Sequence, residues 1–391
     1  MKIQLVACLM ITTIVTFADL FVDFEKGNDR NNGEKTTPLR TFSAAVNKAV
    51  PGDTVFLLPA SKPVNTSLTV RNKKGLPDKP IVIDGMFNTL YGTVRIDEKS
   101  CQKVSPGLYL RKRSNPGAAM VLRYFMCFDG QMQRMERHLK WRNPQFKAVD
   151  ALQAGEWTMQ NNTDIYFKLP SGKAFNDVVV EEPKYISGVQ LEGDCEYLTF
   201  RNLIVRNFWN DGYNIHNNCR NIRFENIAAV ENSDDGISAH EDCQIFVKNM
   251  VSIGNGTGFC HIDRAECHHE NIYIGDCSGR DILLNNKVNT LKNIVVDGSA
   301  RGKLEFTGGQ NSLDNCFFLN LRPGNGMEFK NSTMTVKDSW YCNYALPASG
   351  MPPELKPMKH EEISVRIKEQ RDVLLAIFGD RIKLPLPAQS R

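Results

Sequence analysis

The sequence predicts an all-β solenoid in which short parallel strands stack coil upon coil. Over the second half of the chain, asparagines, glycines and cysteines recur at nearly constant spacing, and apolar residues alternate with polar ones between them. A fixed period between about 20 and 50 residues indicates a stacked repeat. Alternation with period two is typical of strand rather than helix. Each coil then covers the apolar face of the next, which a single coil could not bury alone.

Asparagines form the clearest series, with steps of 22 to 24 residues: Asn202, Asn226, Asn249, Asn271, Asn293 and Asn315. We expect their side-chain amides to hydrogen-bond between neighbouring coils, which lie about 4.8 Å apart. Glycines follow these asparagines about ten residues later, at Gly212, Gly236, Gly258, Gly302 and Gly326. We expect these glycines to occupy turns that require a positive φ.

The cysteines add a third series. Of 11 cysteines, Cys195, Cys219, Cys243 and Cys267 are each 24 residues apart, which predicts a stack of small buried side chains. Adjacent coils are close enough for a disulfide, which stays an alternative. A metal site could be suggested by Cys267 and the nearby His261, His268 and His269. Because the series assigns Cys267 to the core, we do not expect these residues to bind a metal.

The domain boundaries follow from where the period holds. Residues 1–18 have a basic start and an apolar stretch too short for a membrane span, which predicts a signal peptide and a secreted or periplasmic protein. A retained N-terminal anchor is the alternative. Residues 19–346 form the solenoid, with an aperiodic, β-rich insertion at about 98–180. Residues 347–391 comprise a proline-rich linker and a C-terminal helix ending at Gly379.

The ends of the solenoid also carry predictions. Phe42, Val46 and Ala49 share one face of an amphipathic helix, which we expect to cap the open first coil. The run that begins at Pro51 should form the first strand. The C-terminal helix either caps the other end or packs along the side. The insertion either forms a wall of a cleft or is a lobe without function.

Two consecutive coils carry the candidate chemistry. Aligning Gly212 with Gly236 places Asp211 beside Asp235, with Asp234 next to it, and His216 beside His240. If Ile215 and Ala239 point inward, then Asn214, His216, Ser238 and His240 point outward on one sheet. Carboxylates on adjacent coils repel and should split their pKa values, as a general acid and a general base require. The alternative is that Asp211 and Asp235 only form Asp-Gly turns.

The repeat resembles the right-handed parallel β-helix of pectate lyases and polygalacturonases, over most of residues 20–345. Polygalacturonases carry an Asn-x-Asp motif, an Asp-Asp pair one coil later, then Gly-His-Gly and Arg-x-Lys. Asp211 matches the first motif, and Asp234 with Asp235 matches the pair. Thr257 stands in place of the histidine, and Arg280 begins the nearest counterpart of Arg-x-Lys. The resemblance implies a secreted enzyme that acts on a polysaccharide, but not galacturonate specificity.

From these residues we expect a glycoside hydrolase in which paired aspartates, Asp211, Asp234 and Asp235, supply acid and base and His240 assists. The candidate substrate-binding residues are His216, Asn214, Glu241, Asp263 and Arg264. No metal and no cofactor are expected for hydrolysis.

Two other functions stay open. A polysaccharide lyase would use Ca²⁺ or basic residues on the same face. The candidate Ca²⁺ ligands are Asp211, Asp234, Asp235, Glu241 and Asp242, and the candidate bases are His240, Lys248 and Arg264. A β-helix that binds carbohydrate without catalysis is the other. The net charge of +4 permits an acidic polysaccharide as partner. Without a basic cluster interleaved with aromatics, nucleic acid is not an expected partner, and no membrane is expected after signal cleavage.

Overall fold

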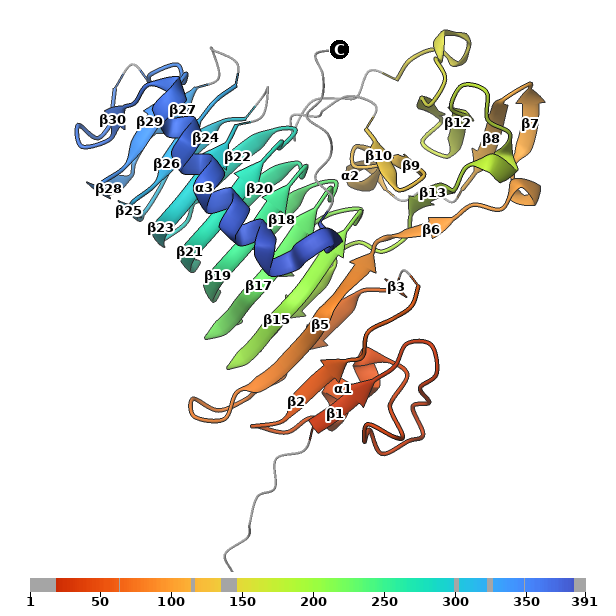
Figure 1. Cartoon of the computed structure of the whole chain (residues 1–391), viewed down its shortest axis with the longest axis horizontal. Coiled ribbons are helices and arrows are strands. Elements are labelled where there is room, and N and C mark those ends of the chain that lie inside the picture. Colours follow the sequence, from red (N-terminus) through yellow and green to blue (C-terminus); the bar gives the residue numbers. More distant parts are fainter. Residues whose placement is uncertain are drawn as a thin grey trace, which may run out of the picture.

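The computed structural model describes residues 19–62, 64–113, 117–134, 146–298, 302–321, 326–347 and 349–382. The predicted signal peptide therefore lies outside the described residues. The described strands wind into a parallel β-helix, so the predicted solenoid is confirmed (Figure 1). One helix lies along its side, a second lies at its N-terminal end, and a separate β-rich lobe projects from it.

Two parallel sheets build the solenoid. The small sheet has eight strands: β4 (Leu68–Arg71), β14 (Val189–Glu192), β16 (Tyr213–Ile215), β18 (Asp235–Ala239), β20 (Thr257–Ile262), β22 (Arg280–Asn285), β24 (Leu304–Phe306) and β27 (Met327–Phe329). The large sheet has fourteen: β1 (Asp19–Val22), β2 (Thr54–Leu57), β3 (Val64–Asn65), β5 (Ile81–Tyr91), β15 (Leu198–Arg206), β17 (Ile222–Val230), β19 (Gln244–Ile253), β21 (Glu266–Gly275), β23 (Val288–Asp297), β25 (Gln310–Asp314), β26 (Phe317–Leu319), β28 (Thr333–Lys337), β29 (Trp340–Cys342) and β30 (Lys356–Pro357).

The predicted asparagine ladder is confirmed and explains the shape of a coil. Each asparagine of the series adopts a left-handed conformation, with φ between 53° and 58°, and bends its long strand into two segments. The side-chain amides bond from coil to coil at 2.9–3.1 Å. At the start of the ladder, Asn202 donates to the Asp84 carboxylate, a partner that the sequence did not reveal. Each coil thus has three strand segments, two from the large sheet and one from the small sheet.

The prediction that the glycine series occupies positive-φ turns is wrong. Gly212, Gly236 and Gly258 do not have positive φ values. Instead, a Cβ atom on Gly236 would lie 2.2 Å from the Ser252 hydroxyl oxygen and 2.7 Å from the Gly258 carbonyl oxygen. A Cβ atom on Gly258 would lie 2.5 Å from the Asp281 carbonyl oxygen. These glycines are therefore required by close packing between coils.

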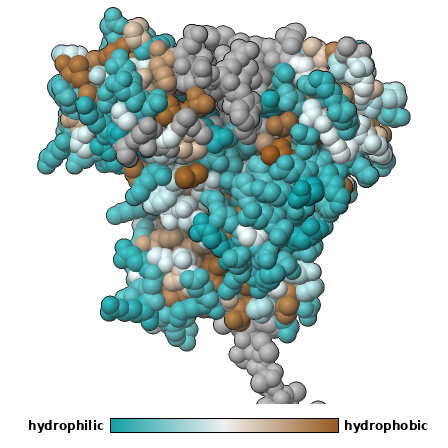
Figure 2. Space-filling view, turned by 180° about the vertical axis from the view of Figure 1, so that it is seen from behind, coloured by the Kyte–Doolittle hydropathy of each residue, from teal (hydrophilic) through white to brown (hydrophobic). Residues whose placement is uncertain are grey.

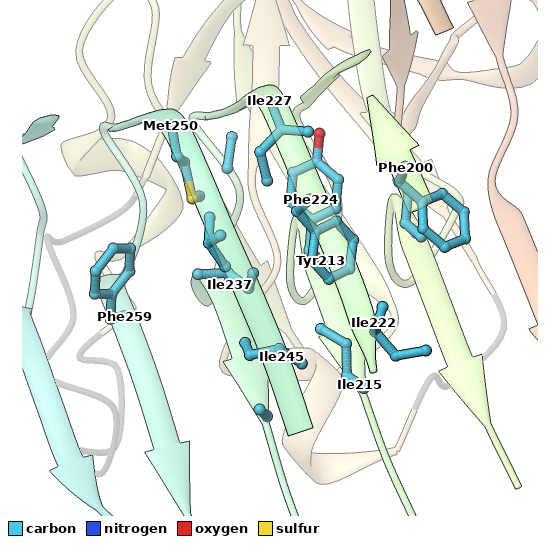
Figure 3. Close-up of a cluster of buried hydrophobic side chains, with 14 of the residues drawn as sticks. Phe200, Tyr213, Ile215, Ile222, Phe224, Ile227, Ile237, Ile245, Met250 and Phe259 are labelled. Carbon is cyan, nitrogen blue, oxygen red and sulfur yellow. The ribbon is translucent and has the colours of Figure 1, made fainter. Parts of the chain in front are cut away.

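Large apolar side chains stack along the axis to form the core, as Figure 3 shows. Phe200 and Phe224 lie face to face with ring centroids 5.5 Å apart. Tyr213 is fully buried because its hydroxyl finds a backbone acceptor, the Leu203 carbonyl, at 2.9 Å. Stacking each coil on the next removes these side chains from water, which supplies most of the stabilisation of such a fold.

The cysteine series is confirmed for three members and wrong for the fourth. Cys195, Cys219 and Cys243 are buried in consecutive coils, and none of the cysteines in the described residues forms a disulfide. The coil that follows is two residues shorter, so Cys267 lies beside Ile245 rather than beside Cys243. A constant spacing of 24 residues therefore misassigned this residue.

Helix α1 (Phe42–Lys48) covers the first coils, as expected. The Thr41 side chain caps it by accepting a hydrogen bond from the Ala44 amide at 3.2 Å, and Phe42 and Val46 are buried against the core. The run that begins at Pro51 does not form the first strand, however. Strand β1 precedes the helix and pairs in parallel with β2.

The insertion is a lobe of two antiparallel sheets with its own apolar cluster. One sheet consists of β6 (Thr93–Arg95), β9 (Met126–Phe128), β10 (Gln131–Gln133) and β13 (Val180–Pro183). The other consists of β7 (Gln102–Ser105), β8 (Leu108–Lys112), β11 (Trp157–Gln160) and β12 (Asp164–Lys168). A short helix, α2 (Ala118–Val121), lies between β8 and β9. Trp209, from the solenoid, belongs to the same cluster and joins the lobe to the β-helix.

Helix α3 (His360–Phe378) packs along the large sheet, which settles the two alternatives for the C-terminal helix (Figure 1). Ile363, Ile367 and Leu374 face the sheet as predicted, and Ile377 packs against the same cluster while partly exposed. Phe378, which was not predicted, is fully buried there. Within the described residues, no helix combines the length and the apolar composition that crossing a membrane needs. The face shown in Figure 2 is largely hydrophilic, with hydrophobic residues in small separate groups.

Candidate functional site

Three carboxylates converge on the outer face of the small sheet. Asp211 lies two residues before β16, Asp234 immediately precedes β18, and Asp235 is the first residue of β18. The Gly212 amide donates to the Asp235 carbonyl at 2.8 Å, which sets Asp211 beside Asp235 as the glycine alignment predicted. One oxygen from each carboxylate lies within 4.8 Å of the other two, and all three residues are buried. The prediction that Asp and Gly here only form turns does not account for this convergence.

Neighbouring polar groups orient the first carboxylate. Asp211 accepts hydrogen bonds from the Asp235 backbone amide at 3.0 Å and from the Ser238 hydroxyl at 2.8 Å. The Ser238 oxygen also lies 3.2 Å from the Asn214 side-chain oxygen. Two donors on one carboxylate favour its ionised form. Asn214 and Ser238 do point away from the core, but both are buried rather than exposed to solvent.

The insertion contributes a cation that sequence reasoning missed. The Arg123 guanidinium lies 2.6 Å from the Asp234 carboxylate, and the Arg123 carbonyl accepts a hydrogen bond from the Ser233 hydroxyl. Arg134 donates to the carbonyls of Ser233 and Gly254, each at 2.8 Å. These contacts make the lobe one wall of the carboxylate cluster, which was one of its two predicted roles. Both arginines precede the aspartates by about 100 residues in an aperiodic segment, so no sequence signal linked them.

The two histidines stack as predicted but lie apart from the carboxylates. The rings of His216 and His240 are parallel within 3°, with centroids 4.3 Å apart. The His216 Nδ1 atom is 3.2 Å from the Glu241 carboxylate. Asp235 begins β18 and His240 follows its last residue, Ala239, so roughly 16 Å of extended backbone separates the two residues.

The predicted substrate-binding residues divide into two groups. Asn214 lies at the carboxylates, whereas His216, Glu241, Asp263 and Arg264 lie beyond the far ends of the same strands. There, Arg264 forms two bonds of 2.6 and 2.7 Å with Asp242, and the Asp263 carboxylate accepts from the Glu241 amide at 3.3 Å.

The candidate bases for a lyase are not gathered at the carboxylates either. Lys248 projects from the large sheet, where it pairs with Glu270 at 3.6 Å. Arg264 lies with the exposed group just described.

Further coils extend the face that carries the carboxylates. Strand register places Thr257 and then Arg280 in line with Asp235. The Arg280 guanidinium is 2.6 Å from the carboxylate of Glu305, a buried residue that the sequence did not single out. Lys303 also contacts Glu305, at 3.4 Å. The outer face of the small sheet therefore carries both acidic and basic side chains along the solenoid axis.

Comparison with known proteins supports the fold. No protein-family model matches the chain, and no curated protein matches it in sequence. A solved structure named as a glycoside hydrolase is similar to it with a TM-score of 0.61 and 12% identity, covering 90% of this chain and 100% of that one. A complex of XylC with xylose has a TM-score of 0.42 at 13% identity, covering 81% and 70% of the two chains. At 12% identity, the likeness to the first of these structures shows a shared fold.

Proposed function

We propose that this chain is a secreted enzyme that hydrolyses glycosidic bonds in a polysaccharide. One observation carries the proposal: three buried carboxylates from two adjacent coils bring their oxygens within 4.8 Å of one another. Glycoside hydrolysis needs a proton donor for the leaving oxygen and a second carboxylate as base or nucleophile. The name of the solved structure with the same architecture, glycoside hydrolase, supports hydrolysis as the first reaction to test.

The surroundings of each carboxylate suggest its role. Asp234 is paired with Arg123 at 2.6 Å, and Asp211 accepts two hydrogen bonds, so both are stabilised as anions. Three negative charges so close together repel, so one of the three carboxyl groups should hold a proton. We propose that this carboxyl group is the general acid, and that the other two activate water or stabilise the positive charge that develops on the sugar.

Elimination is the second candidate, because the same cluster suits a hard cation. Carboxylate oxygens bind Ca²⁺ at about 2.3–2.6 Å, so two ligands on one ion can lie up to about 5 Å apart. The separation of 4.8 Å or less between these oxygens is compatible with that limit. A lyase would use the ion to neutralise the carboxylate of a uronate substrate before a base removes the neighbouring proton.

The test is a panel of neutral and acidic polysaccharides, assayed together for new reducing ends and for the ultraviolet absorbance of unsaturated products, with and without chelator. Hydrolysis predicts reducing ends without absorbance, lost in Asp234→Asn and Asp235→Asn. Asp314→Asn is the matched control, because Asp314 forms a surface pair with Lys337 on the large sheet. Absorbance that disappears when chelator is added would contradict hydrolysis and indicate metal-dependent elimination. Binding without any product would indicate a carbohydrate-binding β-helix.

A further inference from the structure

A second cluster of reactive side chains lies inside the solenoid, one coil beyond Asp235. His261 comes from β20 in the small sheet, and Cys267 and His269 come from β21 in the large sheet. One ligand atom from each lies within 4.8 Å of the other two. The Nε2 atoms of the two imidazoles are 2.9 Å apart, and the rings are parallel within 8°. All three residues are buried, with at most 2% of any of them exposed.

The register of the strands removes the reason to treat Cys267 as a member of the cysteine ladder. It lies beside Ile245 and not beside Cys243, so its sulfur reaches a different part of the core. The Asn286 amide nitrogen is 3.8 Å from this sulfur. Cys267 follows Cys243 by 24 residues, but this coil is only 22 residues long. Cys267 is therefore shifted by two positions along its strand and lies next to the two imidazoles.

The two imidazoles contact each other through their Nε2 atoms. Only one proton can lie between the two Nε2 atoms. The Nδ1 atom of each ring has no hydrogen-bond partner among the described residues, which is costly for buried polar atoms. The hydrogen-bonding capacity of this cluster is thus only partly used by the protein itself.

We propose that His261, Cys267 and His269 form a structural site for a thiophilic metal ion, with Zn²⁺ as the best match. Tetrahedral zinc has Zn–N distances of about 2.0–2.1 Å and a Zn–S distance of about 2.3 Å, which set ligand separations of about 3.3–3.6 Å. The imidazole nitrogens would need to separate by only a few tenths of an ångström. On binding, the Cys267 thiol loses its proton to solvent and the ion gains one thiolate and two neutral nitrogens.

Such an ion would connect the two sheets across the core of one coil. Because its ligands are buried, we expect it to enter during folding and to exchange slowly. The site is separate from the proposed hydrolysis and does not depend on it.

The test is to unfold the full chain, refold it with Zn²⁺ or Co²⁺, remove free metal and measure what is retained. We expect stoichiometric metal and, for Co²⁺, a thiolate-to-cobalt charge-transfer band. Cys267→Ser and His269→Gln should abolish the band. Their matched controls, Cys243→Ser in the ladder and His268→Gln on the outer surface, should retain it.

The wild-type chain decides the matter even if a ligand variant does not fold. Refolded wild type that retains no metal would overturn the proposal and leave a hydrogen-bonded histidine pair. Bound cobalt without a thiolate band would also overturn it, as would loss of the metal in Asp234→Asn, because either result would move the ion to the carboxylates. Retention of the band in Asp234→Asn supports the core site.

Discussion

Two glycines of the same repeat series should respond to alanine with opposite changes in stability. At Gly236, an added Cβ would lie 2.2 Å from the Ser252 hydroxyl oxygen and 2.7 Å from the Gly258 carbonyl oxygen. The hydroxyl can rotate away, but the carbonyl belongs to the backbone of the next coil. At Gly326, the nearest atom among the described residues is the Ala345 carbonyl oxygen, 4.0 Å away. The φ values of both glycines lie outside the left-handed region, so alanine is compatible with either backbone.

The expected magnitudes follow from two terms. Overpacking a tight interior costs about 1–3 kcal/mol. Replacing glycine by alanine also restricts the unfolded chain, which stabilises the protein by about 0.4–1 kcal/mol where the native φ is acceptable. Gly236→Ala should therefore lower the free energy of unfolding by about 1–2 kcal/mol. Gly326→Ala should only restrict the unfolded chain, without overpacking, and should raise the free energy of unfolding by about 0.4–1 kcal/mol.

Urea unfolding followed by circular dichroism measures both variants against wild type. If Gly236→Ala shifts the midpoint no more than Gly326→Ala does, close packing between the coils is not the reason for the glycine series. A positive-φ requirement makes a different prediction, since alanine would then destabilise both positions and asparagine would be tolerated better than alanine at each.

Three further outcomes follow from the structure. Arg123→Met removes the ion pair of the buried Asp234 carboxylate and should lower the free energy of unfolding by about 3 kcal/mol, much of which Asp234→Asn should restore in a double-mutant cycle. Asn249→Ala removes two ladder hydrogen bonds and places alanine at a φ of 58°, so thermal unfolding should show a free energy of unfolding lower by about 2–4 kcal/mol. Asn249→Gly also removes the hydrogen bonds but tolerates this φ, so its free energy of unfolding should fall by less. Burial lowers the pKa values of His261 and His269 below the ordinary value of 6.5, so the unfolded chain binds more protons, and stability should fall by about 1 kcal/mol per histidine between about pH 6.5 and 5.5. His269→Leu should make that fall shallower in a titration of melting temperature, and an unchanged slope would count against buried, neutral imidazoles.

The sequence by itself determined the solenoid and the juxtaposition of its main carboxylates. Repeats reveal register because each coil lies on the previous one, so residues one period apart become neighbours in space. That is why the asparagine ladder could be predicted, and why Asp211 was expected beside Asp235 and His216 beside His240. Coils of equal length made these inferences reliable.

Only the tertiary structure decided what depends on irregular coils and on distant segments. The shorter coil after Cys243 moved Cys267 out of its expected ladder and into contact with two histidines. Arg123, the ion-pair partner of Asp234, lies in the aperiodic insertion. Because no repeat runs through that segment, spacing could not predict this contact. The glycine series had the right spacing but the wrong explanation, because a spacing shows that a small residue recurs and not which atoms press against it. Periodicity fixes neighbours along the axis, whereas contacts across the core and between lobes depend on loop lengths and packing that only the folded chain resolves.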